Sequence, residues 1–428
     1  MIKSTNILKL YKNIADKVKI FMIKQTIIVP AEGFVEWGGG IDYIKYLLRL
    51  LAKINRDDPT IKILLIIPSL TLVDKLIRLI KDCIKFIIRR PIYKKNNGCY
   101  NLFIADIEIS NNVEIMKYNP YKKQGKNSIQ QIVKKSQNPL VFPTMKPLEN
   151  LSCKQIGYIY DLQHISLPHF FTDKECKLRD AAFKNILSRC DGVIVNSKDV
   201  KRHLLEVYPE QANSNKMFST LYLPIVHEII LNQYNKNIDI LKYNLPEKYF
   251  IISNQLWKHK DHKTAFKALQ LLHEDGYNYI NILCTGNTYD YRFPEYYNEM
   301  QKYICELKMV EYIRFLGYID KTEQIAIMQN SIGVLQPTLF EGGPGGGAVY
   351  DAIACGVPAI VSDIPVNKEI EHPQVHFFRA QDSEDLAQKM IHLVNNQLTR
   401  PSLEELKTQR IRNIAKGAQF LHGMFSAI

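Results

Sequence analysis

The stretch best suited to chemistry runs from Gln336 to Asp363, where a glycine-rich loop lies between two acids. Glu341 precedes glycines at 342, 343, 345, 346 and 347, and Asp351 follows in a stretch that is compatible with a helix from Ala348. Backbone N–H groups of such a loop can approach a diphosphate, and a helix that begins there directs its positive end at the same charge. The two acids could accept hydrogen bonds from sugar or ribose hydroxyl groups beside the phosphate. A surface turn with two solvated acids is the alternative.

Strands and helices must position this loop, and their order along the chain is regular. Gln25 to Val29 is a β-branched run that predicts a buried strand, and it leads into Gly38-Gly39-Gly40 and a helical pattern from Ile41. This order is typical of βαβ units and a parallel sheet. Further strands are predicted at 63–67, 102–107, 155–160, 192–195, 249–253, 280–285, 313–316, 333–335 and 359–361.

The alternation of strands and helices runs twice, with an interruption between about Leu223 and Glu247. Pro224, several asparagines and Pro246 break the pattern there. We therefore predict an α/β protein of two doubly wound Rossmann-like domains that face each other across a cleft. The predicted domains are residues 1–230 and 231–428, with the terminal helix packing back on the first domain.

This glycine-rich stretch resembles the retaining glycosyltransferases of family 4, which have the two-domain GT-B architecture. The matching residues are Phe340-Glu341-Gly342 and the run Asp351-Ala-Ile-Ala-Cys-Gly-Val-Pro-Ala-Ile360. The sequence departs from the family in two ways: the second acid is Asp351 instead of Glu, and two additional residues separate it from Glu341. The Ala-Cys-Gly register assigns the role of the second acid to Asp351.

A second segment, Ser253 to His262, resembles the family's Gly-Arg pair followed by a lysine five residues after the arginine. Gln255 stands in the arginine position and Lys260 in the lysine position. In the family, the two cations neutralise the departing diphosphate, where charge builds as the bond to the anomeric carbon breaks. The loss of the arginine should weaken this effect, unless Lys258 or Arg292 compensates.

The first half of the chain carries two further resemblances to the family. Asp161 and His164 match the strand-end Asp-x-x-His segment, which implies that His164 contacts the transferred sugar. Gly38 to Gly40 match the loop that approaches the diphosphate and the acceptor. The alternatives are a structural histidine and a tight turn between a strand and a helix.

The resemblance implies a complete set of site residues. The expected catalytic residues are His164, Lys260 and Glu341. The expected donor-binding residues are Gly39, Gly40, Gln255, Lys260, Gly286, Glu341, Gly342, Gly343, Gly345, Gly346, Gly347, Ala348 and Asp351. No metal and no cofactor are expected, because the Asp-x-Asp metal clamp of the other major glycosyltransferase fold is absent from the sequence.

Charge is unevenly distributed along the chain. Residues 1–135 hold 25 basic and 11 acidic residues, whereas the remaining 293 hold 31 and 32. Such an excess attracts an anionic surface or ligand. The basic amphipathic segment 72–90, with Lys94 and Lys95 after it, could lie on an anionic membrane. A core helix with solvated lysines is the alternative, and no nucleic-acid-binding motif accompanies the charge.

Apolar runs are too short to cross a bilayer, no secretion signal is evident, and the eight cysteines show no metal spacing. These features predict a cytoplasmic protein, with contact to the inner face of the membrane through residues 72–95.

The expected function is the transfer of a hexose from a UDP- or GDP-type nucleotide-sugar donor to a saccharide or lipid-linked saccharide. The expected pathway is surface polysaccharide or lipopolysaccharide biosynthesis, with retention of configuration. Two alternatives stay open. One is a catalytically weakened nucleotide-sugar-binding or scaffold subunit, motivated by Gln255 and Asp351. The other is a GT-B relative such as a nucleotide-sugar epimerase.

Overall fold

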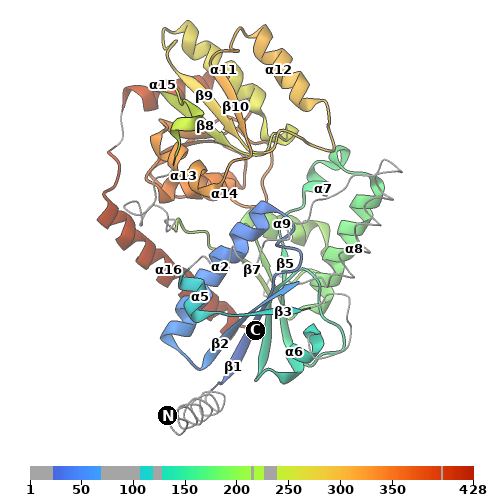
Figure 1. Ribbon diagram of the computed structural model, residues 1–428. Coiled ribbons are helices and arrows are strands. Elements are labelled where there is room, and N and C mark those ends of the chain that lie inside the picture. Colours follow the sequence, from blue (N-terminus) through green and yellow to red (C-terminus); the bar gives the residue numbers. More distant parts are fainter. Residues whose placement is uncertain (1–22, 69–106, 119–127, 214–215, 226–238, 397–398) are drawn as a thin grey trace. The chain divides into compact units, whose positions relative to one another are not determined.

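The chain forms two compact units in a computed structural model that describes residues 23–68, 107–118, 128–213, 216–225, 239–396 and 399–428 (Figure 1). The first unit comprises Met1–Ile159, Lys184–Ile194 and Ala418–Ile428, and the second comprises Tyr160–Phe183 and Val195–Gly417. The predicted basic helix 72–90 lies outside the described residues. So does the predicted strand 102–107, except for Ile107, at which a helix begins.

The first sheet has seven strands in the order β3-β2-β1-β4-β5-β6-β7. The pairs β2/β3, β1/β2, β1/β4 and β4/β5 are parallel. The chain runs outward from β1 to β3 and then returns to β4 on the other side of β1, which makes the sheet doubly wound. The strands are β1 (Gln25–Pro30), β2 (Ile61–Pro68), β3 (Glu114–Tyr118), β4 (Pro139–Thr144), β5 (Lys154–Ile159), β6 (Gly192–Val195) and β7 (Met217–Ser219).

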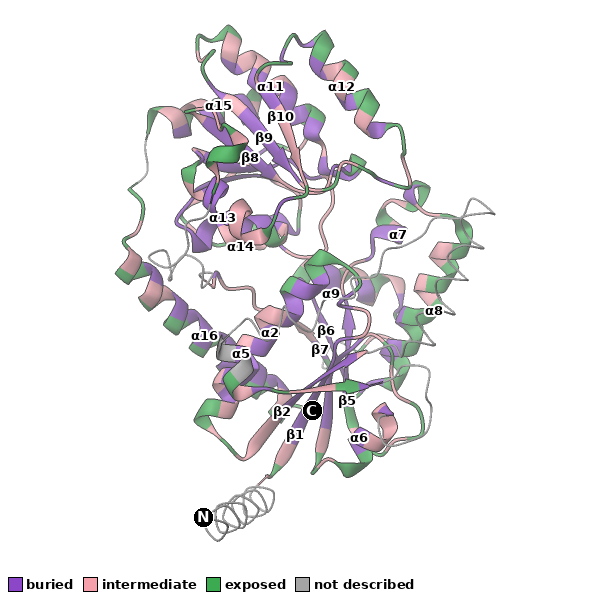
Figure 2. Cartoon of the chain, viewed as in Figure 1, coloured by how far each residue is buried: buried purple, intermediate pink, exposed green. Residues whose placement is uncertain are grey.

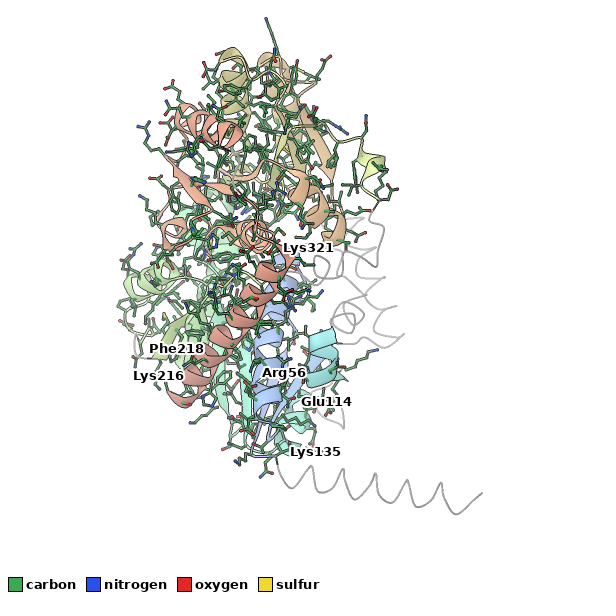
Figure 3. All side chains as sticks on the ribbon, turned by 90° about the vertical axis from the view of Figure 1, so that its left-hand side faces the viewer. Arg56, Glu114, Lys135, Lys216, Phe218 and Lys321 are labelled. Atoms are coloured by element: carbon green, nitrogen blue, oxygen red, sulfur yellow. The ribbon has the colours of Figure 1, made fainter. Side chains whose placement is uncertain are left out.

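The long helix after β1 follows from its apolar spacing. Ile41, Ile44, Leu47, Leu48 and Leu51 recur every three or four residues, and all are buried in α2 (Gly38–Asp57). Figure 3 labels Arg56, which lies in the last turn. The other helices between β1 and β7 are α5 (Ile107–Asn112), α6 (Ile129–Lys135), α7 (Gln163–Ser166), α8 (Asp173–Arg189) and α9 (Lys198–Val207).

The second sheet is parallel throughout, and it has six strands in the order β10-β9-β8-β11-β12-β13. Its strand order reverses between β8 and β11, which are hydrogen-bonded neighbours. In open α/β sheets, ligands bind at the carboxyl ends of the strands at such a switch point. The strands are β8 (Tyr249–Ser253), β9 (Asn281–Thr285), β10 (Ile313–Gly317), β11 (Gly333–Gln336), β12 (Ala359–Ser362) and β13 (Val375–Phe378).

Helices bury both faces of this second sheet. Along β8, Phe250 and Ile252 join one apolar cluster, whereas Tyr249 and Ile251 join the opposite one. A strand that is covered on both sides needs apolar residues at every position, which explains the continuous run at 249–252. Figure 2 shows most of β8 as buried. The helices are α11 (His262–Glu274), α12 (Tyr296–Glu306), α13 (Lys321–Asn330), α14 (Gly346–Ala354), α15 (Ser383–Asn395) and α16 (Leu403–Ser426).

The predicted pair of doubly wound α/β sheets is confirmed. Strands predicted at 192–195 and 249–253 form with those bounds, and most of the others agree within one or two residues. The sequence prediction missed β3, β4, β7 and β13. In β4, prolines at both 139 and 143 resemble turn signals, yet the strand is parallel to β1 and β5. No helix among the described residues is both long and apolar enough to pass through a bilayer.

The end of α16 contributes to the first unit. Residues from Ala418 onward belong to that unit, where Phe425 packs edge-on against Phe142 at 5.0 Å between ring centroids. Lys154 Nζ donates a hydrogen bond of 2.8 Å to the Ile428 carbonyl. The C-terminal residues therefore add to the packing of β4 and β5.

Gly157 in β5 tests how tightly this sheet packs. A Cβ at this position would lie 2.3 Å from Ile186 Cγ2 and 3.1 Å from Cys190 Sγ, both at the end of α8 or just beyond it. We expect Gly157→Ala to lower the free energy of unfolding by about 1–3 kcal/mol because the core would be overpacked. Urea denaturation measures this change.

Gly423→Ala is the matched control, since a Cβ there would meet nothing within 4 Å. This helix position should gain about 0.5–1 kcal/mol. Equal effects of the two substitutions would contradict the packing argument.

Candidate functional site

The switch point of the second sheet brings together Lys260 and Glu341. Lys260 lies in the short 3-10 turn η4 (Lys258–Lys260) that follows β8, and Glu341 follows β11. Lys260 Nζ forms an ion pair with Glu341 Oε1, and each side chain is only 11% exposed. Removing one partner of such a buried pair costs roughly 3–5 kcal/mol, because an uncompensated charge is left behind.

Two amides at the ends of the neighbouring strands hold this ion pair. Gln336 Nε2, at the end of β11, donates 2.8 Å to Glu341 Oε1. Asn254 Nδ2, just after β8, donates 2.6 Å to Gln336 Oε1. Gln336 is fully buried. The sequence prediction missed both amides, although a polar residue at the end of an apolar strand is a signal that could have identified them.

The glycine loop is fixed by its surroundings, unlike a free surface turn. Ser197 Oγ donates 3.0 Å to the Gly342 carbonyl, and a Cβ at Gly342 would lie 2.3 Å from the Tyr160 carbonyl oxygen. The Gly345 N–H donates 2.8 Å to Asn367 Oδ1. Gly345 and Gly346 have φ of +63° and +62°, a region that favours glycine. A Cβ at Gly346 would lie 3.5 Å from Glu341 Oε2, so this glycine lies beside the carboxylate.

Helix α14 begins inside this loop and leaves two donors available. The N–H groups of Gly347 and Ala348 have no hydrogen-bond partner among the residues that the structure describes. A Cβ at Gly347 would meet nothing within 4 Å. Unpaired N–H groups and the helix dipole make the start of α14 suitable for an anion.

The second predicted acid, Asp351, lies on α14 and forms an ion pair with Lys321, the first residue of α13, which is labelled in Figure 3. The two acids therefore have different lysine partners. Lys321 was not among the predicted site residues.

Gln255 and Gly286 connect the loops that follow β8 and β9. The Asn287 N–H donates 2.9 Å to Gln255 Oε1. A Cβ at Gly286 would lie 2.3 Å from the Asn254 carbonyl oxygen, and its φ is +118°. Both residues thus hold the backbone that carries Lys260.

Among the described residues, neither of the expected substitute cations forms an ion pair with Glu341 or Asp351. Arg292 forms a two-pronged ion pair with the fully buried Asp290, with Nε to Oδ1 and Nη2 to Oδ2 both at 3.0 Å. Lys258 Nζ lies 4.9 Å from the centre of the Phe293 ring. The charge of Arg292 is therefore already neutralised.

His164 is fully buried, and both of its ring nitrogens are bonded. Nε2 lies 3.1 Å from Asp180 Oδ1, and Arg179 Nε donates 3.2 Å to Nδ1. Burial lowers the pKa of His164, and the Arg179 charge adds to this, against the opposite effect of Asp180. A hydrogen bond between either ring nitrogen and a sugar would have to replace one of these two bonds.

In the first unit, Gly39 and Gly40 are both closely packed, and at Gly40 the neighbouring backbone requires glycine. A Cβ at Gly39 would lie 2.5 Å from the Trp37 ring. At Gly40 it would lie 2.4 Å from the Phe34 carbonyl oxygen and 2.7 Å from Trp37 Nε1. An approach of these glycines to a diphosphate stays a prediction.

Two buried histidines flank Lys260. His259 Nδ1 and both ring nitrogens of His262 have no hydrogen-bond partner in the described part of the chain. Burial, with the Lys260 charge next in importance, lowers the pKa of His262 to about 3 and that of His259 well below its usual value. Both rings are therefore neutral at pH 7.

These histidines predict a loss of stability in mild acid. An unfolded histidine has a pKa of about 6.5. Between that pH and about 3, the unfolded chain therefore binds a proton that folded His262 does not. The free energy of unfolding should fall as the pH falls through this window, by up to ~1.4 kcal/mol per pH unit for each histidine. His262→Leu should remove its share of the slope in urea denaturation between pH 4 and 6.5. A slope equal to that of the exposed control His422→Leu would refute this assignment.

Comparison with known proteins finds similar sequences for the second half of the chain. Residues 233–415 match the family described as Glycosyl transferases group 1. The O-antigen chain mannosyltransferase RfbU of Salmonella typhimurium is 27% identical over 187 residues, which cover 44% of this chain and 46% of that protein. The match thus spans a little less than half of this relative.

Solved structures share the whole fold. A glycosyltransferase from Rickettsia africae has a TM-score of 0.58 and 17% identity, with coverage of 95% of this chain and 98% of that one. HepE from Anabaena, in complex with UDP and glucose, has a TM-score of 0.60 and 11% identity, with coverage of 94% and 100%. Residues 233–415 are therefore similar to the group 1 glycosyl transferases, and the two-sheet fold is shared with these solved structures, a glycosyltransferase among them.

Proposed function

We propose that the protein is a retaining glycosyltransferase of family 4 that transfers a hexose from a nucleotide-diphosphate-sugar to a saccharide acceptor. The observation that carries the proposal is the Lys260–Glu341 pair, beside a fixed glycine loop with two unpaired N–H groups, at the switch point of the second sheet. The bound UDP and glucose of the structural relative HepE agree with a donor of this class.

In this proposal, charge development on the leaving diphosphate is the step that the site assists. The bond between the anomeric carbon and the phosphate oxygen breaks, and a bond to the acceptor hydroxyl oxygen forms on the same face. The hydroxyl proton passes to the departing phosphate oxygen. Lys260 and the N–H groups of Gly347 and Ala348 would stabilise the growing negative charge.

The remaining predicted residues have supporting roles. Glu341 orients Lys260 and accepts from a sugar hydroxyl group through its second oxygen, and Asp351 accepts from the ribose. His164 is a catalytic residue in this proposal, and it keeps its hydrogen bonds with Arg179 and Asp180. We propose a metal-independent reaction, in which Lys260 and the N–H groups of Gly347 and Ala348 meet the charge of the diphosphate.

The acceptor is proposed to be a saccharide, lipid-linked in surface polysaccharide or lipopolysaccharide biosynthesis. The likeness to RfbU agrees with this pathway. Residues 1–230 would supply the acceptor side and residues 231–428 the donor side. The excess of positive charge in residues 1–135 would favour an anionic membrane at the cytoplasmic face.

A thermal-shift screen against UDP, GDP and ADP and their sugar conjugates tests the donor site. A ligand that binds only the folded state raises the midpoint, by an amount that corresponds to ~2.7 kcal/mol at 100 times its dissociation constant. We expect a shift with one nucleotide and its loss in Lys260→Ala. Lys263→Ala, an exposed lysine on α11, should keep it. A well-folded protein that shifts with none of these ligands would overturn the proposal.

A catalytically weakened subunit is the second candidate, and Gln255 favours it. This residue replaces the family's arginine and is used to bind the Asn287 N–H. If the site is degenerate, Gln255→Arg should raise turnover at least tenfold, because it restores a cation. Gln255→Met, which has similar size and no charge, separates the charge from the lost hydrogen bond. A fall in turnover with both variants would show that glutamine is the working residue.

A further inference from the structure

Several exposed aromatic side chains follow the carboxyl ends of strands in the second sheet. Among the described residues, six aromatic side chains are exposed: Trp37, Trp257, Tyr279, Tyr289, Tyr291 and Tyr318. Four of these follow the carboxyl ends of β8, β9 and β10, at positions 257, 289, 291 and 318. Isolated exposed aromatic residues are ordinary. Ligands of parallel sheets bind at the carboxyl ends of the strands, so a group of aromatic residues there favours a ligand with an apolar surface.

Trp257 is rigidly connected to the proposed diphosphate site. The Lys260 N–H donates 2.8 Å to the Trp257 carbonyl, so the indole lies one turn from the lysine that pairs with Glu341. The Trp257 N–H donates 2.8 Å to the Gln255 carbonyl. The Leu256 N–H donates 2.9 Å to the Asn287 carbonyl, which joins this loop to the one that carries Tyr289 and Tyr291.

A neutralised guanidinium supports the rings. Arg292 Cζ lies 5.0 Å from the centre of the Trp257 ring and 6.0 Å from that of Tyr291. The side chain of its partner Asp290 is completely buried, and that of Arg292 is 8% exposed. Phe170 and Phe171 lie within 6 Å of the same guanidinium. Trp257 nevertheless remains 36% exposed, so part of the supported ring is open to a ligand.

We infer that Trp257, which shares the Arg292 guanidinium with Tyr291, forms a stacking surface for a pyranose ring. The C–H face of a sugar is apolar and matches an aromatic ring, and a fixed indole loses little conformational entropy on binding. The inference rests on the proposed function and assigns a sugar-binding residue to the same site. The ring could belong to the donor's sugar or to the acceptor saccharide, since both bring the same chemistry to the edge of the sheet.

Tryptophan fluorescence tests the inference directly, because the chain has only two tryptophans. In a Trp37→Phe background, all tryptophan emission comes from Trp257. The probes are UDP, GDP, UDP-glucose and GDP-mannose, followed by methyl glycosides of glucose, galactose and mannose added to the nucleotide-bound protein. Emission that changes with a nucleotide sugar and not with its nucleotide identifies the donor's sugar. Emission that changes only with a methyl glycoside identifies the acceptor.

Binding by titration calorimetry gives a second readout. We expect Trp257→Ala to weaken the sugar-dependent step roughly 10-fold, whereas Trp257→Phe should retain it within about threefold. Affinity for the nucleotide alone should stay unchanged in both, which also shows that the variants are folded. Tyr279→Ala is the matched control, because this exposed tyrosine precedes the amino end of β9, away from the carboxyl ends of the strands.

Two results would overturn the inference. One is an equal emission change with nucleotide and nucleotide sugar, which would assign the indole to the base or the diphosphate. The other is sugar-dependent binding in calorimetry that is equally strong in wild type and Trp257→Ala. The absence of any thermal shift with nucleotides and nucleotide sugars would instead reject the proposed donor site, and with it the inference.

Discussion

The site depends on one buried ion pair, between Lys260 and Glu341, at the point where the strand order of the second sheet reverses. Two charges that are nearly removed from water require close pairing and additional hydrogen bonds. Gln336 and Asn254, at the ends of β11 and β8, supply these bonds in series. The two strands that define the switch point are thus coupled to the charged pair through their last residues, and any shift of one strand would misplace the lysine.

A second chain of hydrogen bonds fixes the loop beside this pair. Ser362 Oγ donates 2.5 Å to the Thr338 carbonyl, Asn367 Nδ2 donates 2.9 Å to the Ser362 carbonyl, and Asn367 Oδ1 accepts from Gly345. Gly342 therefore allows close packing, and Gly345 and Gly346 allow left-handed backbone. N–H donors that are fixed before a ligand arrives need no reorganisation when negative charge develops. They therefore stabilise the transition state more than mobile donors would.

The charged residues of this site differ from those of the family motif that the sequence resembles. The position expected to hold a second cation carries Gln255, and the second acid, Asp351, has a lysine partner of its own, Lys321. Arg292 supports aromatic rings and is neutralised by Asp290. Lys260 is therefore the cation on which the proposed diphosphate site depends, and its neighbours His259 and His262 stay neutral through burial.

The sequence by itself determined most of the fold and the core of the candidate site. Local patterns predict burial because strands and helices have fixed periods. Examples are the continuous apolar run 249–252 and the apolar residues repeated every three or four positions from Ile41. Lys260 and Glu341, which are 81 residues apart, were expected in one site because both match one family's motifs, and the structure pairs them. Only the tertiary structure decided the partners of side chains. The amides Asn254 and Gln336, the Lys321–Asp351 pair and the buried position of His164 depend on which strand ends are neighbours. Hydrogen bonds and ion pairs act over a few ångströms, and spacing along the chain does not encode such distances between separate elements.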